Sequence, residues 1–277
     1  MFSTKDEKIR VSSYFRVYNK HMRGPLTGYT KIYEHYCSLR KSRKKKVKGK
    51  WSGVVKRNIS FVFDSKIINE IKNYAPVVDA KSPLPPGGKV YLDYGCGDGQ
   101  TMGLVSDVFR PDEKYCVDID DHRHDKSGKF FRSINDIKNK SIDLITSCQV
   151  LHHVDYKLEK NVSALVNKLK PGGILIIREH DAVTKNHMYN IIVEHMLFDI
   201  GHLADEKKEK SFDEIKTFVD TYHTAQPAWY FSKKRLVKAV LRNRGMKLLH
   251  YKYKIGRNNT RIYNAVFKKM PPGSRNG

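Results

Sequence analysis

Three glycines at alternate positions follow a short apolar run and an aspartate. The glycines are Gly95, Gly97 and Gly99, and Asp93 lies two residues before the first of them. A glycine-rich turn between a strand and a helix lets a ligand approach the backbone, because no Cβ is in the way. The dinucleotide fingerprint would place the last glycine three residues after the second. The spacing therefore indicates a ligand loop of a different kind.

Polar side chains also follow the later apolar runs. Asp118 ends the run 114–120, about 20 residues past the loop, where a carboxylate can accept hydrogen bonds from both hydroxyls of a ribose. Asp120 competes with it for this role. Asn135-Asp136, before the next run, is a further pair of polar candidates. In an open parallel sheet such groups meet at the carboxyl ends of the strands, so we expect one ligand site there.

The chain from residue 89 onward alternates apolar runs with helical periodicity, as a parallel sheet with crossover helices requires. The predicted strands are 90–92, 114–120, 130–131, 142–147 and 174–178, and the predicted helices are 64–74, 101–109, 159–169 and 235–244. Residues 247–255 and 261–267 form a candidate antiparallel pair at the sheet edge. A helix-stop signature, Lys-Pro-Gly-Gly at 170–173, separates the last crossover helix from the fifth strand.

These motifs resemble those of the class I S-adenosylmethionine-dependent methyltransferases. Asp93-x-Gly-x-Gly-x-Gly99 resembles their motif I. Ser-Cys-Gln-Val-Leu-His-His-Val at 147–154 resembles motif IV of the ubiquinone-biosynthesis and tRNA-wobble-uridine enzymes, and residues 169–177 resemble their motif V. The resemblance covers residues 89–180 and extends through the C-terminal segment to residue 268. It implies a Rossmann-like α/β fold: a mostly parallel seven-stranded sheet, helices on both faces and an antiparallel C-terminal edge.

The resemblance also implies S-adenosylmethionine as the cofactor, and it assigns residues to the site. The cofactor-binding candidates are Asp93, Gly95, Cys96, Gly97, Gly99, Asp118, Ile119, Asp136, Ser147 and Cys148. The catalytic candidates are His153, Glu179 and His180. Methyl transfer is an in-line displacement that depends mostly on positioning, and a base is needed only when the acceptor must lose a proton. No metal site is expected.

The charge is strongly segregated along the chain. Residues 1–60 hold 17 Lys/Arg against 3 Asp/Glu, and residues 226–277 hold 14 against none. The middle segment holds 22 against 26, although the whole chain carries a net charge of +24. Two basic ends around a slightly acidic middle are typical of a protein with a polyanionic partner, most often nucleic acid. RNA is therefore the predicted partner, and a cap and a tRNA base are both open as acceptors.

The sequence predicts three parts. Residues 1–75 form a basic, aromatic-rich extension, with helical spacing over 9–18 and 29–39. Residues 76–270 form the methyltransferase domain, in which 182–228 is a helical lid insertion, and 271–277 are a tail. The composition, rich in Lys, Asn and Ile, is also typical of a protein from an AT-rich genome, such as a viral RNA methyltransferase.

The same sequence leaves two alternative functions open and indicates the cellular compartment of the protein. A small-molecule or protein methyltransferase, and a non-catalytic RNA-binding or partner-activating subunit of the same fold, are the alternatives. No apolar run has the length of a membrane span, so we expect a cytoplasmic protein, with nuclear entry as the alternative reading of the basic run 41–50. The four cysteines are widely separated, which indicates neither a disulfide framework nor a cysteine zinc site. The oligomeric state is not predicted.

Overall fold

The computed structural model describes residues 28–47, 59–75, 88–155, 157–206, 208–225, 228–255 and 261–273. The chain divides into two compact units. The first comprises Met1–Lys56, Ala182–Ala228 and Ile255–Arg261, and the second comprises Arg57–Asp181, Trp229–Lys254 and Ile262–Gly277. The predicted insertion at 182–228 thus falls in the first unit. Residues 57–75, which the sequence analysis placed in the N-terminal extension, fall in the second.

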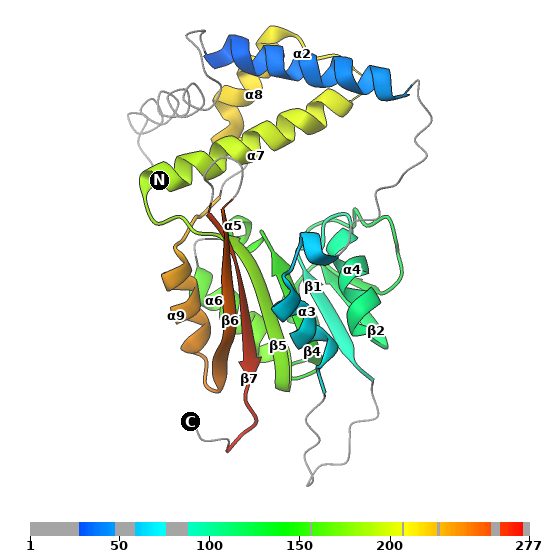
Figure 1. The fold of residues 1–277 in the computed structure, drawn as a ribbon, viewed down its shortest axis with the longest axis vertical. Helices are drawn as coiled ribbons and strands as arrows, with labels where there is room; N and C mark the ends of the chain where they lie inside the picture. Colours follow the sequence, from blue (N-terminus) through cyan, green and yellow to red (C-terminus); the bar gives the residue numbers. More distant parts are fainter. Residues whose placement is uncertain are drawn as a thin grey trace. The chain divides into compact units, whose positions relative to one another are not determined.

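A seven-stranded sheet is the centre of the second unit (Figure 1). Its order is β3-β2-β1-β4-β5-β7-β6. The strands are β1 (Val90–Tyr94), β2 (Glu113–Val117), β3 (Lys129–Phe131), β4 (Ile142–Cys148), β5 (Leu169–His180), β6 (Met246–Ile255) and β7 (Arg261–Lys269). The first five are parallel, and β7 pairs antiparallel with β5. The predicted fold class is confirmed, including the antiparallel C-terminal edge.

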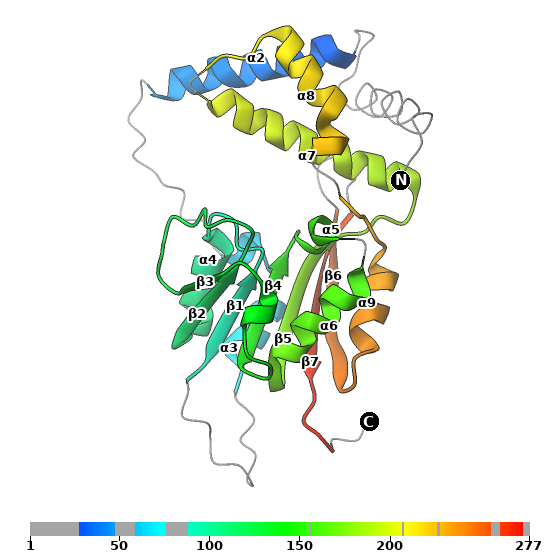
Figure 2. The same cartoon turned by 180° about the vertical axis from the view of Figure 1, so that it is seen from behind.

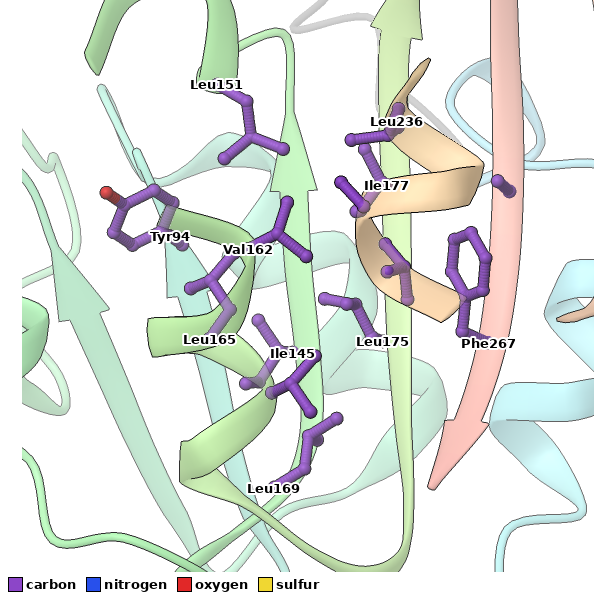
Figure 3. Close-up of a cluster of buried hydrophobic side chains, with 14 of the residues drawn as sticks. Tyr94, Ile145, Leu151, Val162, Leu165, Leu169, Leu175, Ile177, Leu236 and Phe267 are labelled. Carbon is purple, nitrogen blue, oxygen red and sulfur yellow. The ribbon is translucent and has the colours of Figure 1, made fainter. Parts of the chain in front are cut away.

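Helices cover both faces of this sheet (Figures 1 and 2). One face carries α3 (Ser65–Lys72) and α4 (Gln100–Phe109), and the other carries α5 (Leu151–Val154), α6 (Leu158–Lys168) and α9 (Lys233–Leu241). Successive side chains of a strand point to opposite faces, so each central strand contributes side chains to the hydrophobic cores on both faces of the sheet. On β5, Leu175 packs with α6 and α9 (Figure 3), whereas Ile176 packs toward α3 and α4.

The fifth strand begins earlier than predicted. The sequence analysis read residues 170–173 as a turn, but β5 runs continuously from Leu169. The pairing with β4 shifts register between Ile142 and Leu144, which accommodates the Pro-Gly-Gly segment as an irregularity inside the ladder. A Cβ at Gly173 would lie 2.9 Å from the Lys170 carbonyl oxygen, so close backbone approach requires glycine there.

The first unit is helical where it is described. It contains α2 (Gly28–Val47), α7 (Lys185–Asp205) and α8 (Phe212–Ala225), and α2 packs against both of the others. Tyr36 is fully buried, and its hydroxyl accepts a hydrogen bond from the Lys210 backbone N–H at 2.7 Å. Arg40 donates to the Glu206 carbonyl oxygen at 2.8 Å. These contacts tie α2 to the segment between α7 and α8.

Some predictions fall elsewhere in the chain. The predicted helix over 9–18, the end of the basic run beyond Val47 and residues 274–277 lie outside the described residues. Within the described ranges, no helix combines the length and the apolar character needed to cross a membrane.

Candidate functional site

The glycine loop joins β1 to α4 and is held from beneath by its neighbours. The Gly95 N–H donates to the Val117 carbonyl oxygen at 2.7 Å, and the Gly99 N–H donates to the Cys96 carbonyl oxygen at 2.8 Å. All three glycines have positive φ, a conformation that other residues adopt only at a cost. A Cβ at Gly95 would collide with the Val150 side chain at 2.1 Å, whereas one at Gly97 would meet nothing within 4 Å. The loop therefore borders open space at Gly97.

Asp118 is joined directly to this loop. Its Oδ2 accepts a hydrogen bond from the Gly97 N–H at 2.8 Å, and its Oδ1 accepts one from the Ile119 N–H at 2.7 Å. The competing Asp120 instead pairs with Arg132 at 3.2 Å. The Ile119 side chain, two residues past the end of β2, is 77% exposed, which leaves an apolar surface for a ligand beside the carboxylate. The geometry favours Asp118 over Asp120.

Asp93 lies at the floor of the loop. It is buried, and its Oδ1 accepts a hydrogen bond from the Thr146 hydroxyl at 2.7 Å. Burial raises the pKa of Asp93 to about 7, and the nearby charges of Asp118 and Asp98 add to the rise. A cationic ligand above the loop would favour its ionised form.

The other predicted cofactor residues differ in position. Ser147 and Cys148 end β4, next to β1 in the sheet; Ser147 is buried, and burial raises the pKa of the Cys148 thiol. Asp136 is exposed in the short 3-10 helix η2 (Ile134–Asp136) before β4. The strand order thus brings Ser147 and Cys148 next to the carboxyl end of β1, where the glycine loop begins.

Cys96 makes a contact that the sequence analysis did not predict. It forms a disulfide with Cys116, with the two Cα atoms 5.8 Å apart. The expectation of no disulfide was wrong for this pair, because the 20-residue separation hides a spatial proximity. Cys116 on β2 lies opposite Asp93 on β1, three residues before Cys96. The Cys96 side chain therefore contributes to the support beneath the loop.

The segment after β4 is clamped to the end of β5, and Gln149 begins this clamp. The Gln149 N–H donates to the Arg178 carbonyl oxygen at 2.7 Å, and the side-chain amide Nε2 donates to His180 Nε2 at 2.9 Å. Gln149 has φ +59°, in the left-handed region that side chains other than glycine rarely adopt. Such backbone strain clusters at functional sites. Gln149 lies within the motif IV stretch 147–154, but the sequence analysis did not give it a role in the site.

Glu179 completes the clamp from the interior. Its Oε1 accepts hydrogen bonds from the Val150 and Leu151 N–H groups at 2.9 and 2.8 Å, and its Oε2 accepts one from His152 Nδ1 at 2.6 Å. The side chain is fully buried. Burial raises the pKa of Glu179, but the His152 pair and the other donors outweigh it, so the pKa lies below its ordinary value. A carboxylate at the start of α5 suits the positive end of a helix.

The histidines occupy different positions around this carboxylate. His180 is buried, and burial lowers its pKa to about 4, which keeps the imidazole neutral at physiological pH. His153 is exposed on α5, with its ring 4.1 Å from that of His152. The structure therefore places His153 at the surface and Glu179 and His180 beneath it. Glu179 is a positioning residue for the segment that carries His153.

Comparisons with known proteins identify the family of the chain. The family model of a methyltransferase domain matches residues 67–251. An S-adenosylmethionine-dependent methyltransferase structure from Mesorhizobium loti is 12% identical, with 73% of this chain and 96% of that chain covered at a TM-score of 0.46. A structure of S-adenosylmethionine-dependent methyltransferases from Methanosarcina mazei is 19% identical, with 68% of this chain and 94% of that chain covered at a TM-score of 0.44. One from Aquifex aeolicus is 14% identical, with 76% and 93% covered at a TM-score of 0.43. No curated protein matches the chain.

Proposed function

Because the chain belongs to the methyltransferase domain family and uses S-adenosylmethionine as its cofactor, we propose that its methyl acceptor is RNA. The observation that carries this proposal is the charge segregation: 17 cations before residue 61 and 14 after residue 225, around a nearly balanced middle. Internal ion pairs cannot neutralise ends with so few acids. A polyanion would replace the counterions that gather there, which favours binding.

The site residues have different roles in methyl transfer. The bound cofactor supplies an electrophilic methyl group. The cofactor would bind against the open backbone at Gly97, and Asp118 would accept hydrogen bonds from the ribose hydroxyls of the cofactor. Glu179 holds the segment of His153 in place, so that an acceptor is positioned against the rim of the sheet. We assign the acceptor side to His153, the exposed histidine of this segment, whereas the buried imidazole of His180 accepts a hydrogen bond from Gln149 and helps to hold the segment.

Asp118→Ala is expected to weaken S-adenosylmethionine binding by roughly 1–3 kcal/mol, the usual loss for hydrogen bonds to a charged group. The loss combines the ribose contacts with the bond to the Gly97 N–H, which shapes the loop. Asp120→Ala is the matched control, because Asp120 pairs with Arg132 at the exposed end of the same strand. Isothermal titration calorimetry should show the larger loss for Asp118→Ala. A larger loss for Asp120→Ala would move the ribose assignment.

The RNA proposal predicts a salt-dependent affinity that resides in the basic ends. Each phosphate contact contributes about 0.7 to the slope of log affinity against log salt for a single strand. Changing Lys44, Lys45, Lys46 and Lys48 to Ala should therefore flatten that slope by up to about 3 and weaken binding of a single-stranded RNA, without sequence preference. The same four positions changed to Arg retain the charge and should retain the slope.

Transfer of a tritiated methyl group then identifies the acceptor. Wild-type protein is given capped RNA, uncapped RNA, tRNA and a protein extract, and the labelled nucleosides are separated. We expect the label in an RNA nucleoside. The amount of label should fall in the Lys→Ala variant, although its cofactor affinity is unchanged. Label confined to the protein or small-molecule fraction, or an RNA salt slope that survives the substitutions and deletion of residues 1–50, would contradict an RNA acceptor bound by this end.

A further inference from the structure

A groove of about 670 Å³ lies between α9 and the edge strand β6, within the second unit. Its apolar lining consists of Val237 and Leu241 from α9 and Leu248 and Tyr251 from β6. Leu241 is 43% exposed and Tyr251 is 48% exposed. The two α9 residues are four apart, so they form one row along the helix. Leu236, Ala239 and Val240 form the buried face of α9, and Val237 and Leu248 pack partly against the same core. Leu241 and Tyr251 extend this apolar surface outward, where the core does not cover it.

A buried carboxylate fixes the two walls of this groove. Asp181, which follows β5, is 2% exposed. Its Oδ1 accepts a hydrogen bond from the Lys233 N–H at the start of α9 (2.7 Å), and its Oδ2 accepts one from the Tyr253 hydroxyl on β6 (2.6 Å). Ser232 caps the helix at the same point. The separation of helix and strand is therefore built into the fold.

Cations border the apolar row. Lys234, Lys238 and Arg242 line the groove and are exposed, and they recur every four residues along α9. Four residues are about one helical turn, so the charges repeat roughly every 6 Å along the groove. Residues 226–277 contain no acid, and the nearby Glu159 on α6 forms its ion pair with Arg235, with Arg242 as a weaker electrostatic neighbour. An apolar row flanked by a row of like charges is complementary to a ligand with the same two rows and the opposite sign.

We propose that this groove docks an acidic amphipathic helix of a partner protein. Leucine-type side chains at i and i+4 of that helix would fill the floor between Val237, Leu241 and Leu248. Glutamates or aspartates with the same spacing would face Lys234, Lys238 and Arg242. Helix-in-groove recognition of this kind takes its affinity from apolar anchors, and charge complementarity determines orientation and partner choice. The docking assigns three of the 14 C-terminal cations to a protein partner, and the RNA proposal then rests on the N-terminal cations and the remaining 11.

The lining favours a helix over RNA. Single-stranded RNA is held by aromatic platforms on which its bases stack. Here the floor is mainly aliphatic, and its one aromatic ring is already covered on one side: Lys233 Nζ lies 4.1 Å from the centroid of Tyr251. A cation in that position stabilises the ring but occupies the face that a base would use.

The test uses the full chain and a fluorescein-labelled synthetic helix of about five turns, built from Leu-Glu-Ala-Leu-Glu-Glu-Ala repeats. Fluorescence anisotropy should show saturable binding that is lost when the peptide glutamates are replaced with glutamine. The double variant Lys234→Glu/Lys238→Glu should bind roughly tenfold more weakly, and Leu241→Ser roughly fivefold. Arg244→Glu/Lys247→Glu is the control, since both residues are exposed and lie outside the groove lining. It should change the affinity less than about twofold.

Three results would overturn the proposal. The first is no saturable binding, and the second is an equal loss in the two double variants, which would indicate non-specific attraction to a basic surface. The third is displacement of the peptide by an oligouridylate whose own affinity falls with Leu241→Ser, which would assign the groove to RNA. Lys234→Gln/Lys238→Gln, which removes charge without reversing it, is measured beside them, and thermal unfolding confirms that each variant is folded.

Discussion

Gly97→Val is expected to abolish S-adenosylmethionine binding, with an affinity loss of at least about a hundredfold, or about 3 kcal/mol. Two effects act together. Gly97 has φ +49°, which a β-branched residue adopts only with strain, and its Cβ would project into the open space beside the loop. Calorimetric titration with the cofactor measures the loss, and thermal unfolding measures how much stability the strain removes.

Gly103→Ala is the matched control for this substitution. Gly103 lies inside α4, six residues further on, and a Cβ there also meets nothing within 4 Å. Its helical conformation suits alanine, so the variant should be more stable by up to about 1 kcal/mol and should bind the cofactor normally. An unchanged affinity in Gly97→Val would exclude this loop from the cofactor site.

Glu179→Ala is expected to destabilise the protein by about 3–5 kcal/mol, because three buried hydrogen-bond donors lose their acceptor, at about 1–3 kcal/mol each. The substitution leaves the Val150 and Leu151 N–H groups and the His152 ring without the carboxylate that each of them contacts. Glu179→Gln keeps the shape and one acceptor oxygen, so its loss should be smaller, about 1–3 kcal/mol. Urea unfolding measures both variants.

The control for Glu179 is Glu159→Gln on α6. Glu159 is exposed and pairs with Arg235 at 3.1 Å, so its loss should stay below about 1 kcal/mol. Measurement of kcat can contradict the positioning role of Glu179. If Glu179→Gln leaves the unfolding free energy and the cofactor affinity unchanged while kcat falls, the carboxylate acts on the acceptor, as the sequence analysis predicted, and the positioning role is wrong.

The parts of the fold that the sequence predicts correctly are those with local signals. Alternating apolar runs and a glycine loop are sufficient to identify β1 and α4 within two residues of their observed ends. The start of β5 is not determined by a local sequence signal. Pro171 and Gly172 are read as a stop, whereas pairing of Leu169 with Ile142 on β4 extends the strand through them. Tertiary pairing overrides the turn signal there.

The site shows the same division. Asp118 is identifiable because its distance from the loop along the chain reflects one strand–helix–strand unit. The burial of Glu179 could not be predicted, because it depends on the β4–β5 neighbourhood, which brings a carboxylate from β5 onto the first N–H groups of α5. Gln149 was missed for a similar reason. Its positive φ follows from being fastened to both Arg178 and His180.

The strand order has a consequence for synthesis on the ribosome. Among the described strands, β7 is translated after the other six, yet it lies between β5 and β6. Until residues 261–269 leave the exit tunnel, the nascent chain carries β5 with an unpaired edge beside a β4 partner that is already available. Such an edge is a template for pairing with other chains. The nascent protein is therefore most exposed to misassembly, and to chaperone capture, in the interval before β7 emerges, and a chain cut short before Arg261 cannot close its sheet.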